Sequence, residues 1–256
     1  MWYTPKAYLK FLKSATSQHG VHSPFVYTFV TKCLYRKTSK EAKNQLRAYR
    51  NKLRKSDEVI EVTDFGAGSR VFKSNRRAVK DIAKHAGARF SRMKLLNRVV
   101  AYFKPEAILE LGTSVGLASV SLALPKTGKV ISLEGCPQTA AVAQKYLKGA
   151  GLSNVEVVVG DFKQRLPQVI SEKFDLIYFD GNHNKEATLN YFEQLLPTAH
   201  NDCVWIFDDI YWSPQMTEAW ELIKQHPRVS VTVDCFWLGF IFFRTEQVEE
   251  HFKIRV

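Results

Sequence analysis

The stretch from Ala107 to Glu134 constrains the fold more than any other part of the chain. It opens with a short apolar run, which is too short for a helix and is typical of a buried strand. From Gly112 to Gly116 the residues are small, so the backbone can turn tightly and a ligand can approach it closely. A predicted helix and a second predicted strand follow, and Glu134 ends that strand. This order of elements predicts half of a nucleotide-binding crevice.

The glycine spacing bears on the kind of ligand. Dinucleotide-binding turns have the pattern G-x-G-x-x-G, in which the middle glycine lets a pyrophosphate lie against the backbone. Here Ser114 occupies the middle position, in a Gly-x-x-x-Gly turn that follows Glu110. A ligand without a pyrophosphate does not need the middle glycine, so the turn favours such a ligand.

The residues Glu110-Leu111-Gly112-Thr113-Ser114-Val115-Gly116 resemble the first motif of the class I S-adenosylmethionine-dependent methyltransferases, and Leu133-Glu134 resembles their ribose-binding acid. More narrowly, E-L-G-T-x-x-G-x-x-S resembles the small-molecule O-methyltransferases, including the catechol O-methyltransferase-like group. The resemblance covers about residues 89–244. It implies S-adenosylmethionine as cofactor, with these binding residues: Glu110, Gly112, Thr113, Ser114, Gly116, Glu134, Asp161, Phe162 and Asp180.

Regular alternation of strands and helices follows this stretch. Strands are predicted over 155–159, 174–179 and 203–207, and helices over 137–150, 162–170, 185–196 and 214–226. Near-continuous apolar strands with helical crossovers indicate a parallel sheet covered on both faces. Two further strands, 229–235 and 238–243, leave no room for a helix between them and must be antiparallel neighbours.

The predicted fold class is therefore α/β, with a Rossmann-like, seven-stranded, mostly parallel sheet that ends in an antiparallel β-hairpin. This pattern resembles the class I methyltransferases. The hairpin argues against a nicotinamide dehydrogenase more firmly than the glycine spacing does.

The first third of the chain is strongly basic. Its first 98 residues hold 23 Lys and Arg against 6 Asp and Glu, within a chain of net charge +12. Helices are predicted over 3–15, 25–35, 40–55, 75–85 and 89–103, with Ser23 as an N-cap and Pro24 at a first helical position. We therefore expect a basic, mainly helical extension over 1–88, a possible lid, and a methyltransferase domain over 89–256.

A second glycine turn, Asp64-Phe65-Gly66-Ala67-Gly68, also looks like a methyltransferase loop. We reject it as the cofactor site, because a basic helix follows it and no second strand ends in an acid at the expected distance. A glycine turn after a short β-strand is the better interpretation.

The chain shows no apolar run as long as a membrane span, and its N-terminus lacks the apolar core and cleavage site of a signal peptide. The four cysteines have no metal-binding spacing. These features predict a cytoplasmic protein with free thiols and no membrane partner.

Each predicted cofactor residue has an expected role. The backbone of Gly112, Ser114 and Gly116 faces the methionine part, and Glu134 binds the ribose hydroxyls. Asp161 and Phe162 hold the adenine, and Asp180 lies beside the sulfonium. The alternatives are a solvated strand-end acid for Glu134 and a core aromatic for Phe162; these interpretations stay open at this point.

Three acids, Asp180, Asp208 and Asp209, end adjacent predicted strands and could hold Mg²⁺, which prefers oxygen ligands. By resemblance, these positions match the metal ligands of the catechol-type enzymes. Two departures stand against this match: Asp209 replaces an Asn of the family, and Gly181-Asn182-His183-Asn184 replaces its base lysine. The segment also resembles a related methyltransferase group in which a metal is not the rule, so the metal stays open.

His183 is the candidate for proton removal from the acceptor, together with Asp180, because imidazole titrates near neutral pH and His183 follows a strand at the crevice edge. The alternative is a loop histidine bound to its helix start. His19 and His22 could belong to a lid, although structural turn histidines fit better.

The sequence is compatible with three functions. We favour methyl transfer to a hydroxyl of a small-molecule acceptor. The alternatives are an RNA (tRNA) methyltransferase that binds nucleic acid through its basic N-terminal region, and a non-catalytic domain that binds the cofactor or a partner. The sequence names neither the acceptor nor the oligomeric state.

Overall fold

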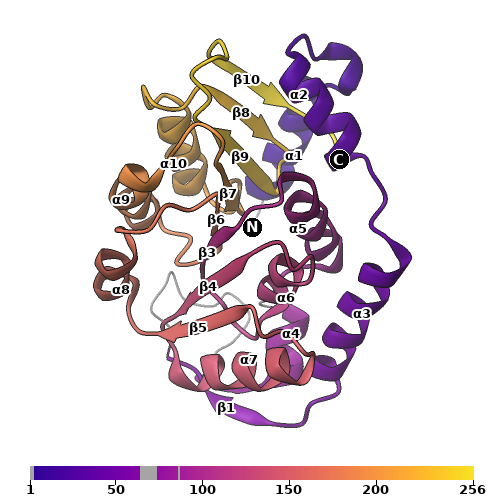
Figure 1. Ribbon diagram of the computed structural model, residues 1–256, viewed down its shortest axis with the longest axis vertical. Helices are drawn as coiled ribbons and strands as arrows, with labels where there is room; N and C mark the ends of the chain where they lie inside the picture. Colours follow the sequence, from indigo (N-terminus) through magenta and orange to yellow (C-terminus); the bar gives the residue numbers. More distant parts are fainter. Residues whose placement is uncertain (1–2, 64–73, 86) are drawn as a thin grey trace. The chain divides into compact units, whose positions relative to one another are not determined.

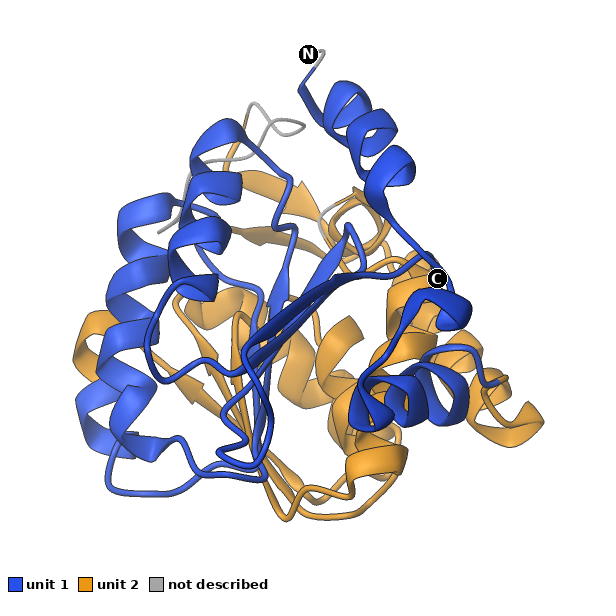
Figure 2. Ribbon diagram, turned by 90° about the horizontal axis from the view of Figure 1, so that it is seen from above, with its two compact units in different colours: residues 1–36, 166–256 blue, residues 37–165 orange. Residues whose placement is uncertain are grey.

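The computed structural model describes residues 3–63, 74–85 and 87–256. Contacts divide the chain into two compact units, residues 1–36 with 166–256 and residues 37–165 (Figure 2). The predicted boundary at residue 88 separates an extension from a methyltransferase domain and stays a prediction. No helix in the described ranges is both long and apolar enough to cross a membrane.

The unit of residues 37–165 is built on three parallel strands in the order β3-β4-β5 (Figure 1). Its elements are α3 (Lys40–Arg54), β1 (Val59–Glu61), β2 (Arg76–Ala78), α4 (Val79–His85), α5 (Phe90–Phe103), β3 (Ala107–Leu111), α6 (Leu117–Ala123), β4 (Lys129–Glu134), α7 (Pro137–Gly149), β5 (Val155–Val159) and the start of α8 (Phe162–Val169). Leu111 of β3 pairs with Leu133 of β4. The turn after β3 therefore lies at the same sheet edge as Glu134.

Helix α6, which follows the glycine turn, is buried at every residue from Leu117 to Ala123. It is buried on all sides because α3 and α5 both pack against it, in addition to β4. In α3, the buried residues are those of its predicted apolar stripe, Leu46, Tyr49 and Leu53. The remaining side chains of α3 are mostly basic and exposed or half-buried.

The unit of residues 1–36 and 166–256 has the strand order β10-β8-β9-β7-β6. Its elements are α1 (Tyr3–Ser14), η1 (Gln18–Gly20), α2 (Pro24–Phe29), η2 (Val30–Leu34), β6 (Leu176–Phe179), α9 (Lys185–Leu195), η3 (Leu196–Thr198), β7 (Val204–Asp208), α10 (Pro214–Lys224), β8 (Val231–Asp234), β9 (Leu238–Phe242) and β10 (Glu250–Lys253). Strands β6 and β7 run parallel, whereas β9 runs antiparallel to both β7 and β8. The predicted hairpin is thus confirmed.

Helix α2 is held on this sheet by aromatic contacts. Phe25 and Phe29 meet the ring of Phe242 edge-on, at centroid distances of 4.9 and 5.6 Å. The helix begins as predicted, because Ser23 Oγ accepts a hydrogen bond from the Val26 N–H and Pro24 occupies the first helical position.

Three expectations need correction, although each of the seven predicted sheet strands is present. Residues 76–78, expected in a helix, form β2, because they pair with β1 before α4 begins. The helix expected over 25–35 changes to a π-helical turn at η2. Strand β10 was not predicted, and it adds a parallel edge strand beside β8. Its sequence Glu-His-Phe-Lys lacks the apolar pattern of a central strand. The rejected glycine turn at 64–68 lies outside the described residues.

Candidate functional site

The glycine turn has the backbone that its residue types predict. Gly112, Ser114 and Gly116 all have positive φ, at 104°, 49° and 80°. The Gly112 and Thr113 N–H groups donate to the carbonyl of Leu133, at 3.0 and 3.2 Å, which fixes the turn to the end of β4. A left-handed Ser114 is unusual, since residues other than glycine seldom adopt this conformation. Such backbone strain is common at ligand-binding turns.

Glu134 closes the turn from the neighbouring strand. Its Oε2 accepts a hydrogen bond from the Ser114 N–H at 2.7 Å, and its Oε1 accepts one from the Cys136 N–H at 2.9 Å. The side chain is half-buried. A carboxylate offers about four acceptor positions, so Glu134 retains the capacity to accept hydroxyl groups of a ligand. The interpretation of Glu134 as a merely solvated acid does not account for these two bonds.

Glu110 lies inside the unit, behind the turn. It is 0% exposed, and its Oε2 accepts hydrogen bonds from the hydroxyls of Ser119 and Ser132. Its Oε1 is buried and has no hydrogen-bond partner within the described residues. Burial raises the pKa of Glu110 to about 7; the serine hydrogen bonds lower it and the charge of Glu134 adds to the rise. Contact of Glu110 with a cofactor therefore stays a prediction, whereas its support of the turn is a feature of the structure.

Tyr49 of α3 is a residue that sequence reasoning missed. Its hydroxyl donates a hydrogen bond of 3.0 Å to the carbonyl of Val115 in the turn. A Cβ on Gly116 would lie 2.5 Å from this hydroxyl, which is too close. The position of the Tyr49 hydroxyl therefore requires a glycine at residue 116. The pKa of Tyr49 is raised well above its usual value, mainly by burial and to a smaller extent by the nearby Glu110 and Tyr146. The hydroxyl therefore keeps its proton and remains a hydrogen-bond donor. The only sequence signal was its place in the apolar stripe of α3.

The predicted adenine residues lie where β5 ends. The Gly160 N–H donates to the carbonyl of Glu134 at 2.9 Å, which brings this end beside that of β4. Asp161 Oδ1 accepts a hydrogen bond from the Lys163 N–H and caps the start of α8. Phe162, the first residue of α8, is half-buried. The structure thus groups Glu134, Asp161 and Phe162 at one edge, and their contacts with an adenosine stay predictions.

In the other unit, Asp180 and Asp208 end two paired strands. Phe179 of β6 lies opposite Phe207 of β7, so the two acids that follow are neighbours. Asp208 is 2% exposed, and its Oδ1 accepts a hydrogen bond of 3.0 Å from the Asp209 N–H. Asp209 itself has a φ of 52°. Among the described residues, no group of three or more acids, histidines or cysteines is placed to hold a metal. The predicted set of three carboxylates is therefore not assembled in the described part of the chain.

His183 and Asp180, the two catalytic candidates, lie near each other, and their roles stay predictions. His183 Nε2 lies 3.7 Å from Asp180 Oδ1, and its ring lies 5.9 Å from that of Trp212. Asn182 and His183 both have positive φ, so the loop is held in a strained conformation. The start of α9 is capped by Asn184, whose Oδ1 accepts from the Ala187 N–H. The alternative of a histidine bound to its helix start is therefore not the observed arrangement. Trp212 was not predicted as a site residue.

A family described as a methyltransferase domain matches residues 109–210 of the chain. This range begins in β3 and ends just after β7, so it includes the glycine turn, Glu134, Asp180, His183 and Asp208. The resemblance to the class I S-adenosylmethionine-dependent methyltransferases, drawn above from the residues alone, is confirmed by this match and by the relatives that follow.

Among curated proteins, the chain is similar to the catechol O-methyltransferases of Niastella koreensis and Mycobacterium tuberculosis. The first is 35% identical over 123 residues, 46% of this chain and 55% of that protein. The second is 32% identical over 120 residues, 46% of this chain and 54% of that protein. The chain thus spans about half the length of the curated relatives it matches.

Among solved structures, the O-methyltransferase TomG from Streptomyces achromogenes covers 90% of this chain and 99% of its own, with a TM-score of 0.57 and 18% identity. An O-methyltransferase from Bacillus cereus covers 85% and 97%, with a TM-score of 0.53 and 21% identity. These similarities establish the fold: an α/β methyltransferase fold with a mostly parallel central sheet and antiparallel strands.

Proposed function

We propose that the chain is an S-adenosylmethionine-dependent methyltransferase that moves a methyl group to a hydroxyl of a small-molecule acceptor. The observation that carries the proposal is the hydrogen bond from the Ser114 N–H to Glu134 Oε2, which joins the glycine turn to the acid of the next strand. It lies within the range matched by the methyltransferase domain family. The structure of TomG is described as a complex with S-adenosylmethionine, and that of the Bacillus cereus enzyme as a complex with its demethylated product, SAH.

The donor is proposed to bind along the turn and the neighbouring strand ends. The backbone from Gly112 to Gly116 takes the methionine part, Glu134 takes the ribose hydroxyls, and Asp161 with Phe162 takes the adenine. Bound in this way, S-adenosylmethionine supplies an activated methyl group with a good leaving group. The protein's own contribution is to fix the donor, align the acceptor and remove its proton.

Replacing Tyr49 with phenylalanine is expected to weaken S-adenosylmethionine binding about fivefold, the effect of one lost neutral hydrogen bond of about 1 kcal/mol. The turn carbonyl of Val115 loses its donor, while the packing of the ring is kept. Titration calorimetry measures the change, and the rate at saturating donor should stay unchanged because Tyr49 acts by positioning the turn. Tyr146→Phe is the matched control, since that hydroxyl has no hydrogen-bond partner in the described part of the chain. Equal losses in both variants would contradict the positioning role.

Proton removal is proposed for His183, with Asp180 to orient it and stabilise the imidazolium that forms. The 3.7 Å distance between them is looser than a hydrogen bond, as is common for catalytic pairs before the substrate binds. Trp212 lies beside the imidazole and offers an aromatic surface to a flat acceptor. Relatives named catechol and caffeoyl-CoA O-methyltransferase support an aromatic hydroxyl as the acceptor class.

A divalent cation was predicted at Asp180, Asp208 and Asp209. Among the described residues, these acids do not form a group of three or more that is placed to hold a metal. No step of the proposed reaction passes through a cation.

The other two candidate functions are not favoured. The relatives are named for small-molecule acceptors, whereas an RNA acceptor rests only on the basic side chains of the N-terminal region. A non-catalytic domain would not need His183 and Asp180 held together in a strained loop.

We expect His183→Ala to lower the rate of methyl transfer to catechol or caffeoyl-CoA about 100-fold, the usual contribution of a general base, without changing donor affinity. Mass spectrometry of the products gives the rate, and calorimetry gives the donor affinity. His200→Ala is the matched control, because His200 pairs with Asp175 at 3.3 Å before β6 and β7 begin. The rate should survive a chelator in the wild type. If the wild-type rate fell on chelation and returned with Mg²⁺, and if Mg²⁺ did not restore it in Asp208→Asn, a metal-dependent reaction would replace the proposed one. If the chain bound the donor but transferred no methyl group to any hydroxyl, the non-catalytic binding domain would be the remaining candidate function.

A further inference from the structure

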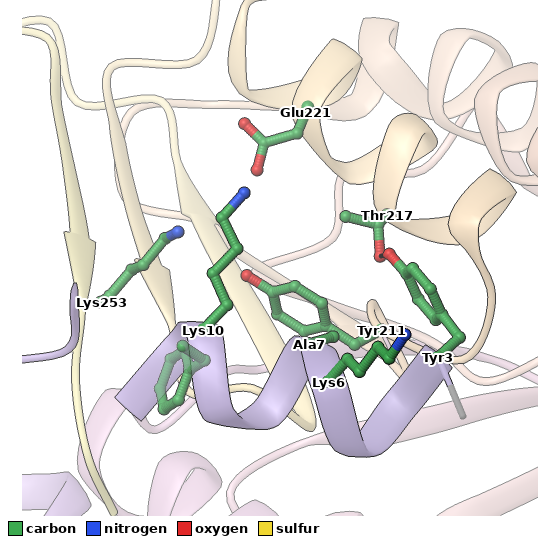
Figure 3. Close-up of a pocket in the computed structure, with 9 residues that line it drawn as sticks. Tyr3, Lys6, Ala7, Lys10, Tyr211, Thr217, Glu221 and Lys253 are labelled. Carbon is green, nitrogen blue, oxygen red and sulfur yellow. Dashed lines mark hydrogen bonds between the residues drawn. The ribbon is translucent and has the colours of Figure 1, made fainter. Parts of the chain in front are cut away.

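A second candidate site lies within the unit of residues 1–36 and 166–256, between α1, α10, β10 and the segment after β7 (Figure 3). It is a cavity of about 580 Å³. This volume falls in the range of about 300–1,000 Å³ that small-molecule sites occupy. None of the residues assigned above to the donor, the base or the acids lines it.

Three lysines supply most of the charge of this cavity. Lys6 and Lys10 lie one turn apart on α1, and Lys253 comes from β10. In Figure 3 the ammonium groups of Lys10 and Lys253 point into the same space. None of the three forms an ion pair within the described residues. The two converging cations, Lys10 and Lys253, repel each other, and an anion between them removes that repulsion.

One acid also lines the cavity, and it is already engaged. Glu221 of α10 forms an ion pair with Lys224, in which Glu221 Oε2 lies 2.7 Å from Lys224 Nζ. The Glu221 carboxylate also faces the Lys10 ammonium (Figure 3). The lining therefore carries three lysines against one acid that is shared with Lys224, which leaves a net positive charge. The local field therefore favours a negative ligand.

Part of the cavity lining is apolar and rigid. Phe11 and Tyr211 are 3% and 7% exposed. The Tyr211 ring stacks on Phe236 at 4.7 Å, with an interplanar angle of 10°. Its hydroxyl donates to Asp234 at 2.6 Å. A ring fixed at both its face and its tip offers a preformed surface to the apolar part of a ligand.

The rim is fixed as well. The Tyr3 hydroxyl donates to Thr217 Oγ1 at 2.7 Å, and that hydroxyl donates to the carbonyl of Ile210 at 3.0 Å. At the other end of α1, the Thr16 N–H donates to the carbonyl of Lys253 at 2.8 Å. Helix α1 is thus tied to α10 at one end and to β10 at the other, so the lysines it carries are held over the cavity.

We propose that this cavity binds a small organic anion, with its carboxylate or phosphate between Lys10 and Lys253 and its apolar body against Phe11 and Tyr211. The ligand site is separate from the transfer reaction, and its test needs neither the methyl donor nor an acceptor. Tyr211 follows Asp208 and Asp209 closely in the chain, so an occupied cavity would contact the segment that carries those acids.

The test is calorimetric titration of the whole chain with phenyl phosphate and, separately, benzoate. We expect at least one of them to bind with a Kd below about 1 mM. Phenol, which lacks the charge, and inorganic phosphate, which lacks the ring, should each bind at least about tenfold more weakly, a difference of about 1.4 kcal/mol. The preferred head group follows from which of the two anions binds more tightly.

Variants locate the binding. Lys10→Gln and Lys253→Gln remove the charge but keep an unbranched polar side chain, and each should weaken anion binding about tenfold. Ala7→Trp should fill the cavity. Lys13→Gln is the matched control, since Lys13 is exposed on the same helix and does not line the cavity. Thermal unfolding checks that each variant is folded. The proposal is overturned if neither anion binds the wild type, if inorganic phosphate binds as well as phenyl phosphate, or if Lys13→Gln has the same effect as Lys10→Gln.

Discussion

Replacing Glu134 with alanine is expected to weaken S-adenosylmethionine binding at least about 100-fold, since hydrogen bonds to a charged group contribute about 1.5–3 kcal/mol each. The carboxylate accepts one bond from the Ser114 N–H and one from the Cys136 N–H. Its loss leaves the Ser114 N–H without this acceptor, while the bonds of Gly112 and Thr113 to Leu133 remain, and it removes the proposed acceptor of the ribose hydroxyls. Titration calorimetry with the donor measures the effect.

The control for this variant is Glu156→Ala on the adjacent strand β5. Glu156 pairs with Lys129 at 2.7 Å, but both side chains are more than half exposed, so little stability depends on the pair. Donor binding should be unchanged there. If Glu134→Ala retained wild-type affinity, the turn would be only a corner of the chain and the donor would bind elsewhere. Binding of NAD to the wild type would point to a dinucleotide site instead.

The parts of the fold that the sequence predicts are those determined by neighbours along the chain. Strand β3 is a short apolar run that stops at Gly112, and the positive φ values of Gly112 and Gly116 explain why those positions hold glycine. The hairpin of β8 and β9 follows from a connection too short for a helix. In each case a local rule of length or conformation leaves one solution.

The parts that were missed depend on partners far away in the sequence. Tyr49 reaches Val115 across 66 residues, and nothing in the pattern of α3 marks that hydroxyl. Strand β10 is polar because it pairs only with β8 at the edge of its sheet. The same limit applies to Asp208: its position at a strand end is evident in the sequence, but the bond from the Asp209 N–H depends on a backbone φ of 52° that no residue type announces.

Replacing Glu110 with glutamine is expected to remove a large pH dependence of folding stability. The pKa of this buried carboxyl is raised from 4.5 to about 7, so the folded chain binds its proton more tightly than the unfolded chain does. The stabilisation is complete below pH 4.5 and is lost as the pH rises through 7, because above that value the folded state must hold a buried charge. From pH 5 to pH 8 this loss amounts to roughly 2–3 kcal/mol.

Glutamine keeps an oxygen for the hydroxyls of Ser119 and Ser132 and carries no charge at either pH. The free energy of unfolding of Glu110→Gln should therefore change less from pH 5 to pH 8 than that of the wild type, by roughly 2–3 kcal/mol in urea titrations. All other titrating groups are common to both proteins, so the difference isolates Glu110. Glu156→Gln, at an exposed site, should follow the wild type. Parallel pH profiles for Glu110→Gln and the wild type would mean that the carboxyl is ionised at both pH values. Glu110 would then support the turn as a buried, ionised carboxylate, and the raised pKa inferred from its burial would be wrong.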